Sequence, residues 1–503
     1  MGQSVHSEQS AWMGIDLGTQ SVRAVVIGDD GALLGSGSAP LSSQRFADGR
    51  HEQDPAQWWE SLGAASRAAL TGLTGVRIGG VSTCGTSGTV LLVANTPDDP
   101  AQPRSAALMY DDARAESEAL RVQAAPAEVW ERNGISPQRT WALPKAMWLT
   151  DRAEDMAGLR LAHQVDVINS RLAGEPVAAD TSNALKTGVD PVTAEWPVDD
   201  LERLGLNRSL FPRLRRPGEL LGTVEAVAAA HTGLPPGTPI IAGMTDGCAA
   251  QIAAGVLEPG QWNFVIGTTI VLKGVSERLL RDPSGALYSH HAPDRRWWPG
   301  GASSAGAAVL ADEYPASDYD ELDRIAAQRE PAGSVIYPLS GPGERFPFRD
   351  TAATRLELGH ASDREDRYAA ILQGVAYVQR LCLDHVGALG ASVGETITVT
   401  GGATRSRYWP QLQADILGRR VSVPRLAEGA VGMAILAAAG IEAPGADRLA
   451  ATAARLTGPM TTYHPRPGAA ERFAPGYFSL VAALEDRGWI SADFAHTILT
   501  GGY

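Results

Sequence analysis

The sequence predicts a two-domain α/β protein in which mixed β-sheets are flanked by helices. Its 503 residues exceed what one hydrophobic core usually organises. A pattern of strand, Gly-Thr turn and strand occurs twice, about 250 residues apart, and helical patterns alternate with the strands. We therefore expect a disordered tail at 1–11, an N-terminal domain at 12–257 and a C-terminal domain at 258–503.

Composition limits the classes of function and the partners. Hydrophobic residues make up 44% of the chain and charged residues 20%, which is typical of globular proteins. The net charge of −14 argues against a nucleic-acid partner. The three cysteines are scattered without metal or disulfide spacing, which fits a reducing cytoplasm. No apolar run has the length of a membrane span, so we expect no membrane partner.

The first repeated stretch, residues 14–26, predicts a β-hairpin with a functional turn. Gly18 and Thr19 allow a phosphate to approach the backbone amides closely. Asp16, at the end of a strand, is suited to hold hydrated Mg²⁺, because this cation prefers carboxylate oxygen and water. The residues alone leave open an ordinary hairpin with a solvated aspartate.

The following elements extend this hairpin into a mixed sheet covered by helices. A turn at 29–31 leads into a third strand at 32–40. Asp54 is expected to cap a helix that starts at Pro55. Strands at 78–82 and 90–94 then flank a loop rich in Gly, Ser and Thr.

Two further acidic positions are candidates for chemistry. Asp111, Asp112 and Arg114 have the groups to bind polyol hydroxyls, but a helix N-cap with a solvated first turn is the favoured interpretation. Asp246 follows a strand at 240–242 and precedes a helix, the place where α/β sheets carry catalytic groups. An N-cap is the alternative interpretation for Asp246 too.

The second half repeats the hairpin without its carboxylate. A strand at 262–266, the turn Gly267-Thr268-Thr269 and a strand at 270–273 predict two halves built alike, each offering backbone amides to phosphates across a cleft. Residues 299–306 are small and are expected to open a helix. A strand at 397–400 ends in Gly401-Gly402, which has no side chain to obstruct an adenine ring, although a glycine pair by itself is a weak signal.

Taken together, these motifs resemble the FGGY carbohydrate kinases, members of the actin, Hsp70 and hexokinase ATPase superfamily. The resemblance extends from about residue 12 to about residue 477, with the motifs in the family's order. The matching motifs are Gly14-Ile15-Asp16-Leu17-Gly18-Thr19, Glu52-Gln53-Asp54-Pro55 with Trp58-Trp59, Asp112-Ala113-Arg114, Pro144-Lys145 with Trp148, residues 243–247, Gly267-Thr268-Thr269, Ser340-Gly341 with Glu344-Arg345 and Pro347, and Thr400-Gly401-Gly402-Ala403 with Arg405-Ser406 and Trp409.

The resemblance implies an actin-like (ribonuclease H-like) fold with ATP in the interdomain cleft. It implies Mg-ATP-dependent phosphorylation of a sugar or polyol hydroxyl, with Asp16 positioning the metal and Asp246 as catalytic base. A homodimer is common among similar proteins. The further implied contacts are Gly18, Thr19, Gln20, Gly267, Thr268 and Thr269 with phosphates, Gly401, Gly402 and Ser406 with adenosine, and Thr86, Ser87, Asp112, Asp246 and Ser303 with the sugar.

The substrate is less sharply indicated. Many xylulose kinases of the family carry Met-His-Gly where this chain has Thr86-Ser87-Gly88. Residues 85–91 and 243–248, with Lys273, look more like the D-ribulose kinase branch. We therefore expect conversion of D-ribulose to D-ribulose 5-phosphate, ahead of D-xylulose or another ketose or polyol. An actin- or Hsp70-like ATPase acting on protein partners is the alternative of a different class, disfavoured by Asp112 and Asp246.

Overall fold

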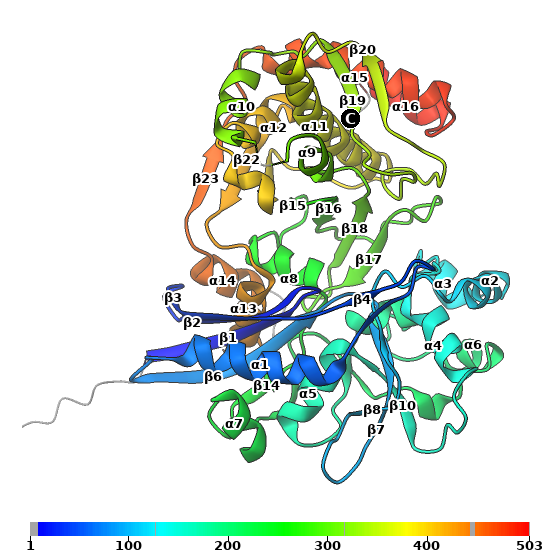
Figure 1. Cartoon of the computed structure of the whole chain (residues 1–503), viewed down its shortest axis with the longest axis vertical. Coiled ribbons are helices and arrows are strands. Elements are labelled where there is room, and N and C mark those ends of the chain that lie inside the picture. The colour runs from blue at the N-terminus through cyan, green and yellow to red at the C-terminus, as the bar shows by residue number, and fades with distance from the viewer. Residues whose placement is uncertain (1–8, 126, 316, 443–447, 502–503) are drawn as a thin grey trace, which may run out of the picture. The chain divides into compact units, whose positions relative to one another are not determined.

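The computed structural model describes residues 9–125, 127–315, 317–442 and 448–501. They form two compact units (Figure 1). The first unit extends to Gly255 and includes His290–Arg296 and Glu428–Gly458, and the second contains Val256–Ser289, Trp297–Ala427 and the chain from Pro459. Of the expected tail, residues 1–8 lie outside the described residues, whereas 9–11 already belong to a strand.

The main sheet of the first unit has the spatial order β13 (Leu220–Thr223), β14 (Pro239–Ile241), β6 (Val76–Gly85), β1 (Gln9–Leu17), β2 (Ser21–Gly28) and β3 (Leu33–Pro40). β1, β2 and β3 pair antiparallel, as the sequence predicts. β6 is parallel to β1, and β14 is parallel to β6. The carboxyl ends of β1, β6 and β14 therefore meet at one edge of the sheet.

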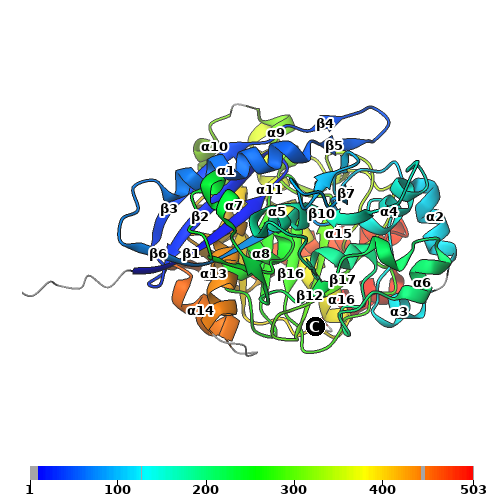
Figure 2. The ribbon, with the colours of Figure 1, turned by 90° about the horizontal axis from the view of Figure 1, so that it is seen from below.

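Helices cover both faces of this sheet. α1 (Pro55–Leu70) and α5 (Gln164–Ala173) lie on one face, and α13 (Gly429–Glu442) lies on the other (Figures 1 and 2). α1 and α13 approach the strands so closely that glycine is required at the contacts. A Cβ on Gly37 would lie 2.1 Å from the Ala65 carbonyl oxygen, and one on Gly14 would lie 1.7 Å from the Ala430 carbonyl oxygen. Asp54 caps α1 through the Ala56 amide, which confirms the predicted helix start.

A second sheet of the first unit has the order β10 (Leu159–His163), β7 (Val90–Ala94), β9 (Ala107–Leu108), β5 (His51–Gln53) and β4 (Gln44–Arg45), with β8 (Gln102–Pro103) paired to β7. The expectation that 90–94 extends the first sheet is therefore wrong. The other elements of this unit are α2 (Glu116–Ala124), α3 (Glu128–Arg132), α4 (Ala142–Thr150), β11 (Ala179–Asp180), η1 (Asn183–Thr187), α6 (Val198–Arg203), η2 (Arg208–Leu210), β12 (Leu214–Arg215), α7 (Ala226–Thr232), α8 (Asp246–Ala253) and α14 (Arg448–Leu456).

The sheet of the second unit has the order β17 (Tyr288–His291), β18 (Trp297–Ser303), β16 (Ile270–Gly274), β15 (Trp262–Ile266), β21 (Thr396–Thr400), β22 (Arg420–Pro424) and β23 (Met460–Tyr463). From β18 to β23 the strand directions match those from β3 to β13 in the first unit. This match confirms the prediction of two halves built alike. Residues 299–303 belong to β18 and do not open a helix, because 300–303 pair with β16.

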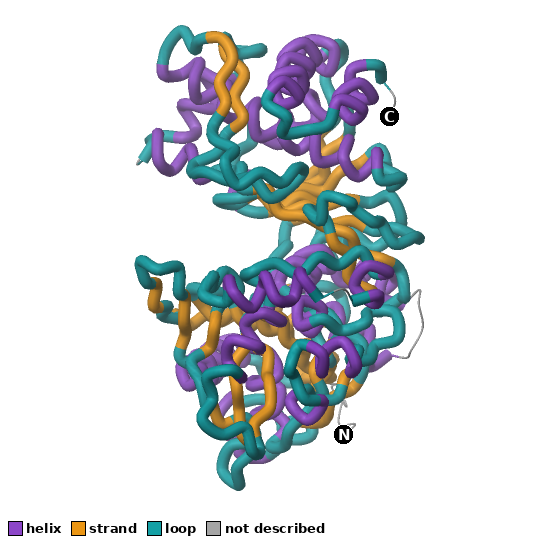
Figure 3. Tube along the Cα trace, turned by 90° about the vertical axis from the view of Figure 1, so that its right-hand side faces the viewer, coloured by secondary structure: helices purple, strands orange, loops and turns teal. Residues whose placement is uncertain are grey.

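Helices complete the second unit, and Figure 3 shows strands with helices packed against them in both units. The buried helix α11 (Arg364–Ala388) contributes much of the second core. Among the described residues, no helix combines the length and apolar character needed to cross a membrane. The remaining elements are α9 (Ala308–Glu313), α10 (Tyr319–Ala326), β19 (Ser334–Tyr337), β20 (Leu356–Gly359), η3 (Gly402–Arg405), α12 (Trp409–Leu417), α15 (Ala469–Asp486) and α16 (Ala492–Leu499).

Candidate active site

The strand register brings the two predicted catalytic carboxylates to the same edge of the first sheet. Asp16, near the end of β1, pairs with Cys84 of β6. The next residue of β6, Gly85, forms a parallel bridge with Thr245, which follows β14 and precedes Asp246. Three strands distant in sequence therefore place Asp16 and Asp246 in one neighbourhood, as expected for a site at the carboxyl edge of parallel strands.

The environment of Asp16 makes its charged form less favourable than that of a solvated aspartate. Burial, followed by the negative charge of Asp246, raises the pKa of Asp16 from 3.8 to about 6. The Cys84 thiol donates a hydrogen bond to Asp16 Oδ1 at 3.4 Å. A Cβ on Gly429, the first residue of α13, would lie 3.0 Å from Asp16 Oδ2. Sequence reasoning missed Cys84 and Gly429, because neither lies near Asp16 in the chain.

Asp246 occupies the first turn of α8. The N-cap is Thr245, so the alternative interpretation of Asp246 as N-cap is wrong. Asp246 Oδ1 accepts a hydrogen bond from the Gly247 amide at 2.7 Å, and the residue is exposed. Ser182 Oγ, which sequence reasoning missed, accepts one from the Thr245 amide at 3.3 Å. The site thus presents an accessible carboxylate in the first turn of a helix.

Gln53 stabilises the turn after Asp16 by a hydrogen bond to its backbone. The Gly18 amide donates to the Ser21 carbonyl at 3.0 Å, which closes the hairpin. The buried Gln53 donates from Nε2 to the Thr19 carbonyl at 2.7 Å and accepts from Trp58 Nε1 at 2.8 Å. The motif that contains Gln53 is visible in the sequence, but its contact with the turn is not.

Asp112 is a buried carboxyl group that pairs with an arginine, and it is not a helix cap. α2 begins at Glu116 with Ala115 as its N-cap, which overturns the favoured cap interpretation. Asp112 is 0% exposed, and its Oδ2 accepts from the His51 amide at 2.7 Å and from Arg114 Nη2 at 2.7 Å. Arg114 also pairs with Glu52 at 2.6 Å. These bonds fix the loop that carries Asp112, as burial of a charge requires.

Lys145, also missed as a functional residue, supports the same loop. Its buried ammonium donates to the Met109 carbonyl at 2.7 Å. Burial, followed by the charge of Lys186, lowers the pKa of Lys145 from 10.5 to about 7. The loop is therefore tied both to a buried carboxylate and to a buried amine.

Thr86 and Ser87, the expected sugar contacts, differ in their hydrogen bonding. Thr86 Oγ1 is bonded to Thr89 Oγ1 at 2.6 Å and to Gln164 Oε1 at 2.9 Å. Ser87 Oγ is buried and has no hydrogen-bond partner within the described part of the chain. A buried hydroxyl without a protein partner is able to bond a ligand or water.

The second unit has the predicted hairpin turn between β15 and β16. The Gly267 amide donates to the Thr269 carbonyl at 3.0 Å. Thr268 is exposed, and a Cβ on Gly267 would meet no atom within 4 Å. The turn is thus open to a ligand.

Ser303, Gly401 and Ser406 each have a structural contact in the same unit. Ser303 is 0% exposed, and its Oγ donates to Glu344 at 2.8 Å. Gly401 has a φ of +90°, and a Cβ there would lie 2.5 Å from the Ile266 carbonyl oxygen. Ser406 Oγ accepts from the Trp409 amide at 2.8 Å at the start of α12. Gly402 is exposed beside them.

The fit of Mg²⁺ rests on the carboxylates. No group of three or more His, Cys, Asp or Glu side chains arranged for a metal occurs among the described residues. Asp16 nevertheless suits this cation, which takes one or two carboxylates together with water and substrate phosphates. Burial and the negative charge of Asp246 raise the pKa of Asp16, and a bound cation would favour the charged form of this carboxylate.

Comparisons with known proteins identify the family. Residues 11–253 match the N-terminal domain, and residues 262–441 the C-terminal domain, of the FGGY family of carbohydrate kinases. The chain is 30% identical to the xylulose kinase of Streptomyces coelicolor over 94% of this chain and 97% of that protein. For the xylulose kinase of Escherichia coli, the identity is 27% over 82% and 85%.

A solved structure agrees with the sequence comparisons. The crystal structure of xylulose kinase from Rhodospirillum rubrum superimposes with a TM-score of 0.81 at 26% identity, covering 95% of this chain and 99% of that one. Proteins of this family have the actin-like ATPase fold that the sequence predicts. The chain therefore belongs to the FGGY family of carbohydrate kinases and is a sugar kinase.

Proposed function

We propose that this kinase transfers the γ-phosphoryl group of Mg-ATP to a ketopentose hydroxyl and that D-xylulose is its substrate. The observation that carries the proposed chemistry is the meeting of Asp16 and Asp246 at the carboxyl edge of β1, β6 and β14. The curated relatives and solved structures named xylulose kinase support the choice of sugar over the expected D-ribulose.

In the proposed reaction Asp246 is the general base. Its accessible carboxylate accepts the proton of the attacking hydroxyl as the new O–P bond forms. The bond between the γ-phosphorus and the bridging oxygen breaks, and ADP leaves. Mg²⁺, when bound beside Asp16, neutralises charge on the phosphates. Gly247, by donating to Asp246 Oδ1, helps to hold this carboxylate in place.

The nucleotide contacts are proposed from the exposed backbone of the hairpin turns and the glycine pair. Thr19 and Gln20 in the first unit, and Thr268 and Thr269 in the second, are proposed to offer amides or hydroxyls to phosphates. Gly18 and Gly267, whose amides close the turns, let a phosphate approach the backbone. Gly401, Gly402 and Ser406 are proposed to accommodate adenosine. The positive φ of Gly401 supports this role, because the turn leaves no side chain over the backbone.

Ser87 is the proposed sugar contact of the 86–88 loop. Its buried hydroxyl lacks a partner among the described residues, and Lys186 Nζ holds the Ser87 carbonyl at 3.2 Å. We propose that Asp112 and Ser303 act on the sugar indirectly, through the residues to which they are hydrogen-bonded. D-ribulose is the second candidate substrate, favoured by the serine at a position where many xylulose kinases carry histidine.

The test is ADP formation from Mg-ATP with D-xylulose, D-ribulose, L-ribulose, ribitol and glycerol, in wild type beside Asp246→Asn. We expect D-xylulose to give the highest kcat/KM, and the variant to lose about 1,000-fold in kcat. A higher kcat/KM for D-ribulose would replace the proposed substrate and keep the mechanism. Undiminished turnover in a folded Asp246→Asn variant would remove the proposed base.

Compartment and assembly remain predictions. The buried free thiols of Cys84, Cys248 and Cys382 are consistent with the expected reducing cytoplasm. The expected homodimer is to be checked by light scattering of the full chain.

A further inference from the structure

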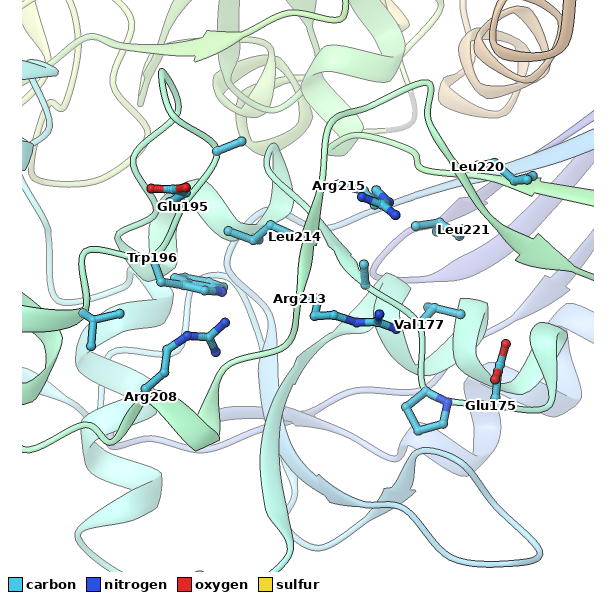
Figure 4. Close-up of a pocket in the computed structure, with 14 residues that line it drawn as sticks. Glu175, Val177, Glu195, Trp196, Arg208, Arg213, Leu214, Arg215, Leu220 and Leu221 are labelled. Carbon is cyan, nitrogen blue, oxygen red and sulfur yellow. The ribbon is translucent and has the colours of Figure 1, made fainter.

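A pocket of the first unit, apart from the candidate active site, lies beside the ribbon formed by β11 and β12. Its volume is about 540 Å³, within the range of small-molecule sites. It shares no lining residue with the candidate active site. Figure 4 shows three arginines, a tryptophan and apolar side chains around it; the residues used below are Arg208, Arg213, Arg215, Trp196, Val177 and Leu221.

The guanidinium groups of this pocket have most of their donors unused. Arg208 is fixed by one bond from Nη1 to the Phe211 carbonyl at 2.9 Å. The side chain of Arg213 makes no hydrogen bond or ion pair with any other described residue. Arg215 lies 4.0 Å from Glu219, and both side chains are about half exposed, so this ion pair is weak. The guanidinium donors are therefore available to an anion.

Another pocket of this chain contains an arginine whose charge is neutralised by neighbouring carboxylates. In the second unit, a pocket of about 480 Å³ is lined by Arg367, Glu313 and Glu357. Arg367 donates to both carboxylates at 2.7 Å. In the first pocket, Glu175 and Glu195 lie on opposite sides (Figure 4), and neither pairs with an arginine in any described contact. Unneutralised arginines are notable in a chain of net charge −14.

The indole of Trp196 forms a rigid apolar wall. Its Nε1 donates to the Pro212 carbonyl at 2.8 Å, and its ring packs on Phe211 with centroids 4.7 Å apart. The ring is thereby fixed without help from a ligand. Together with Val177 and Leu221, it offers apolar surface for the carbon skeleton of a bound molecule.

We propose that this pocket binds a small phosphorylated metabolite, with its phosphate on Arg208 and its sugar part against the neighbouring Trp196, while Arg213, which extends from the 213–215 segment toward Val177, adds positive charge to the pocket (Figure 4). Inorganic phosphate alone would leave most of the volume and the apolar wall unused. The ligand class is therefore a sugar phosphate, and the free phosphate ion is the alternative source of the same chemistry.

The experiment is isothermal titration calorimetry of the full-length protein with D-ribose 5-phosphate and, separately, with inorganic phosphate. The tested variants are Arg208→Gln/Arg213→Gln and Trp196→Phe. Arg104→Gln is the matched control, because Arg104 is also exposed and its side chain has no described partner. The active-site residues are the same in all variants, so a difference between them reports the pocket. Thermal melting confirms that each variant is folded.

We expect D-ribose 5-phosphate to bind wild type and Arg104→Gln with Kd values within twofold of each other. The double arginine variant should raise Kd at least tenfold. Trp196→Phe should weaken the sugar phosphate and leave inorganic phosphate unchanged. Equal affinity in wild type and the double variant, or no binding by wild type at about 10 mM, would overturn the proposal. Equal affinity for both probes would overturn the sugar-phosphate assignment.

Discussion

The two hairpin turns share one backbone plan and differ in what precedes them. Gly18 follows β1, which pairs with the parallel strand β6, and Gly267 follows β15, which pairs with the parallel strand β21. Two residues before each glycine, the first hairpin has Asp16 and the second has Val265. The first turn thus adjoins a titratable carboxylate, and the second adjoins an apolar side chain.

The strands next to each hairpin add to this difference in charge. β6 brings Cys84, and the chain after β14 brings Asp246, to the first hairpin. β21 brings Thr400 and the left-handed Gly401 to the second. One plan therefore supports two tasks: the first unit concentrates negative charge suited to a cation and a base, whereas the second exposes backbone suited to a nucleotide.

The largest expected effect comes from removing the charge that distinguishes the hairpins. Asp16→Asn should lower kcat about 1,000-fold, because its carboxylate is proposed to position Mg²⁺. Steady-state kinetics at saturating Mg-ATP measure this loss. Asp30→Asn, in the exposed turn at the other end of β2, is the control and should stay within twofold of wild type. Comparable losses in both variants would contradict the assignment.

In the second unit, the backbone should matter more than any carboxylate. Gly401→Ala should cost about 2 kcal/mol of stability and raise the KM for ATP, because its φ is +90° and the new Cβ would meet the Ile266 carbonyl. Thermal melting and ATP titration measure both effects. Gly402→Ala is the matched control for stability alone, because the nearest atom to its Cβ lies 3.9 Å away and its melting temperature should change little. The prediction fails if the two variants lose the same stability.

A smaller effect should follow from loosening the first turn. Gln53→Met keeps the side-chain length but removes the bond to the Thr19 carbonyl and leaves the Trp58 indole without its acceptor. We expect a roughly tenfold rise in the KM for ATP, from a loss of about 1.4 kcal/mol. Gln57→Met, whose Oε1 accepts only from the exposed Ser42 amide, is the control. An unchanged KM for ATP in Gln53→Met would show that the turn keeps its conformation without the bond from Gln53.

The smallest expected effect is a pH dependence of the stability that Asp16 causes. The pKa of Asp16 is about 6 in the folded protein and near 3.8 when unfolded, so folding favours its protonated form. The charged form therefore lowers stability increasingly as pH rises from 3.8 to 6, by about 3 kcal/mol in total. Without metal, Asp16→Asn should melt above wild type at pH 7.5, with a smaller difference at pH 5. A difference independent of pH would refute the raised pKa.

The sequence located the catalytic candidates better than it explained them. Asp16 and Asp246 were predicted from strand ends, and the structure brings them together. Taken by itself, the segment of Asp111, Asp112 and Arg114 was interpreted as a helix cap, and Asp112 was expected to contact the sugar only from the family resemblance. Its burial against Arg114 and the His51 amide depends on β5, about 60 residues earlier in the chain. No local pattern contains that contact.

By itself, the sequence determined the repeated hairpins, the start of α1 and the two-part organisation, because period-two alternation, turn glycines and capping residues act over a few residues. Only the tertiary structure decided that residues 428–458 pack with the first unit, although they fall in the range expected for the second domain. The same packing places Gly429 against Asp16. Such contacts depend on close packing between segments some 400 residues apart, and sequence periodicity carries no information about which partner fills a given space.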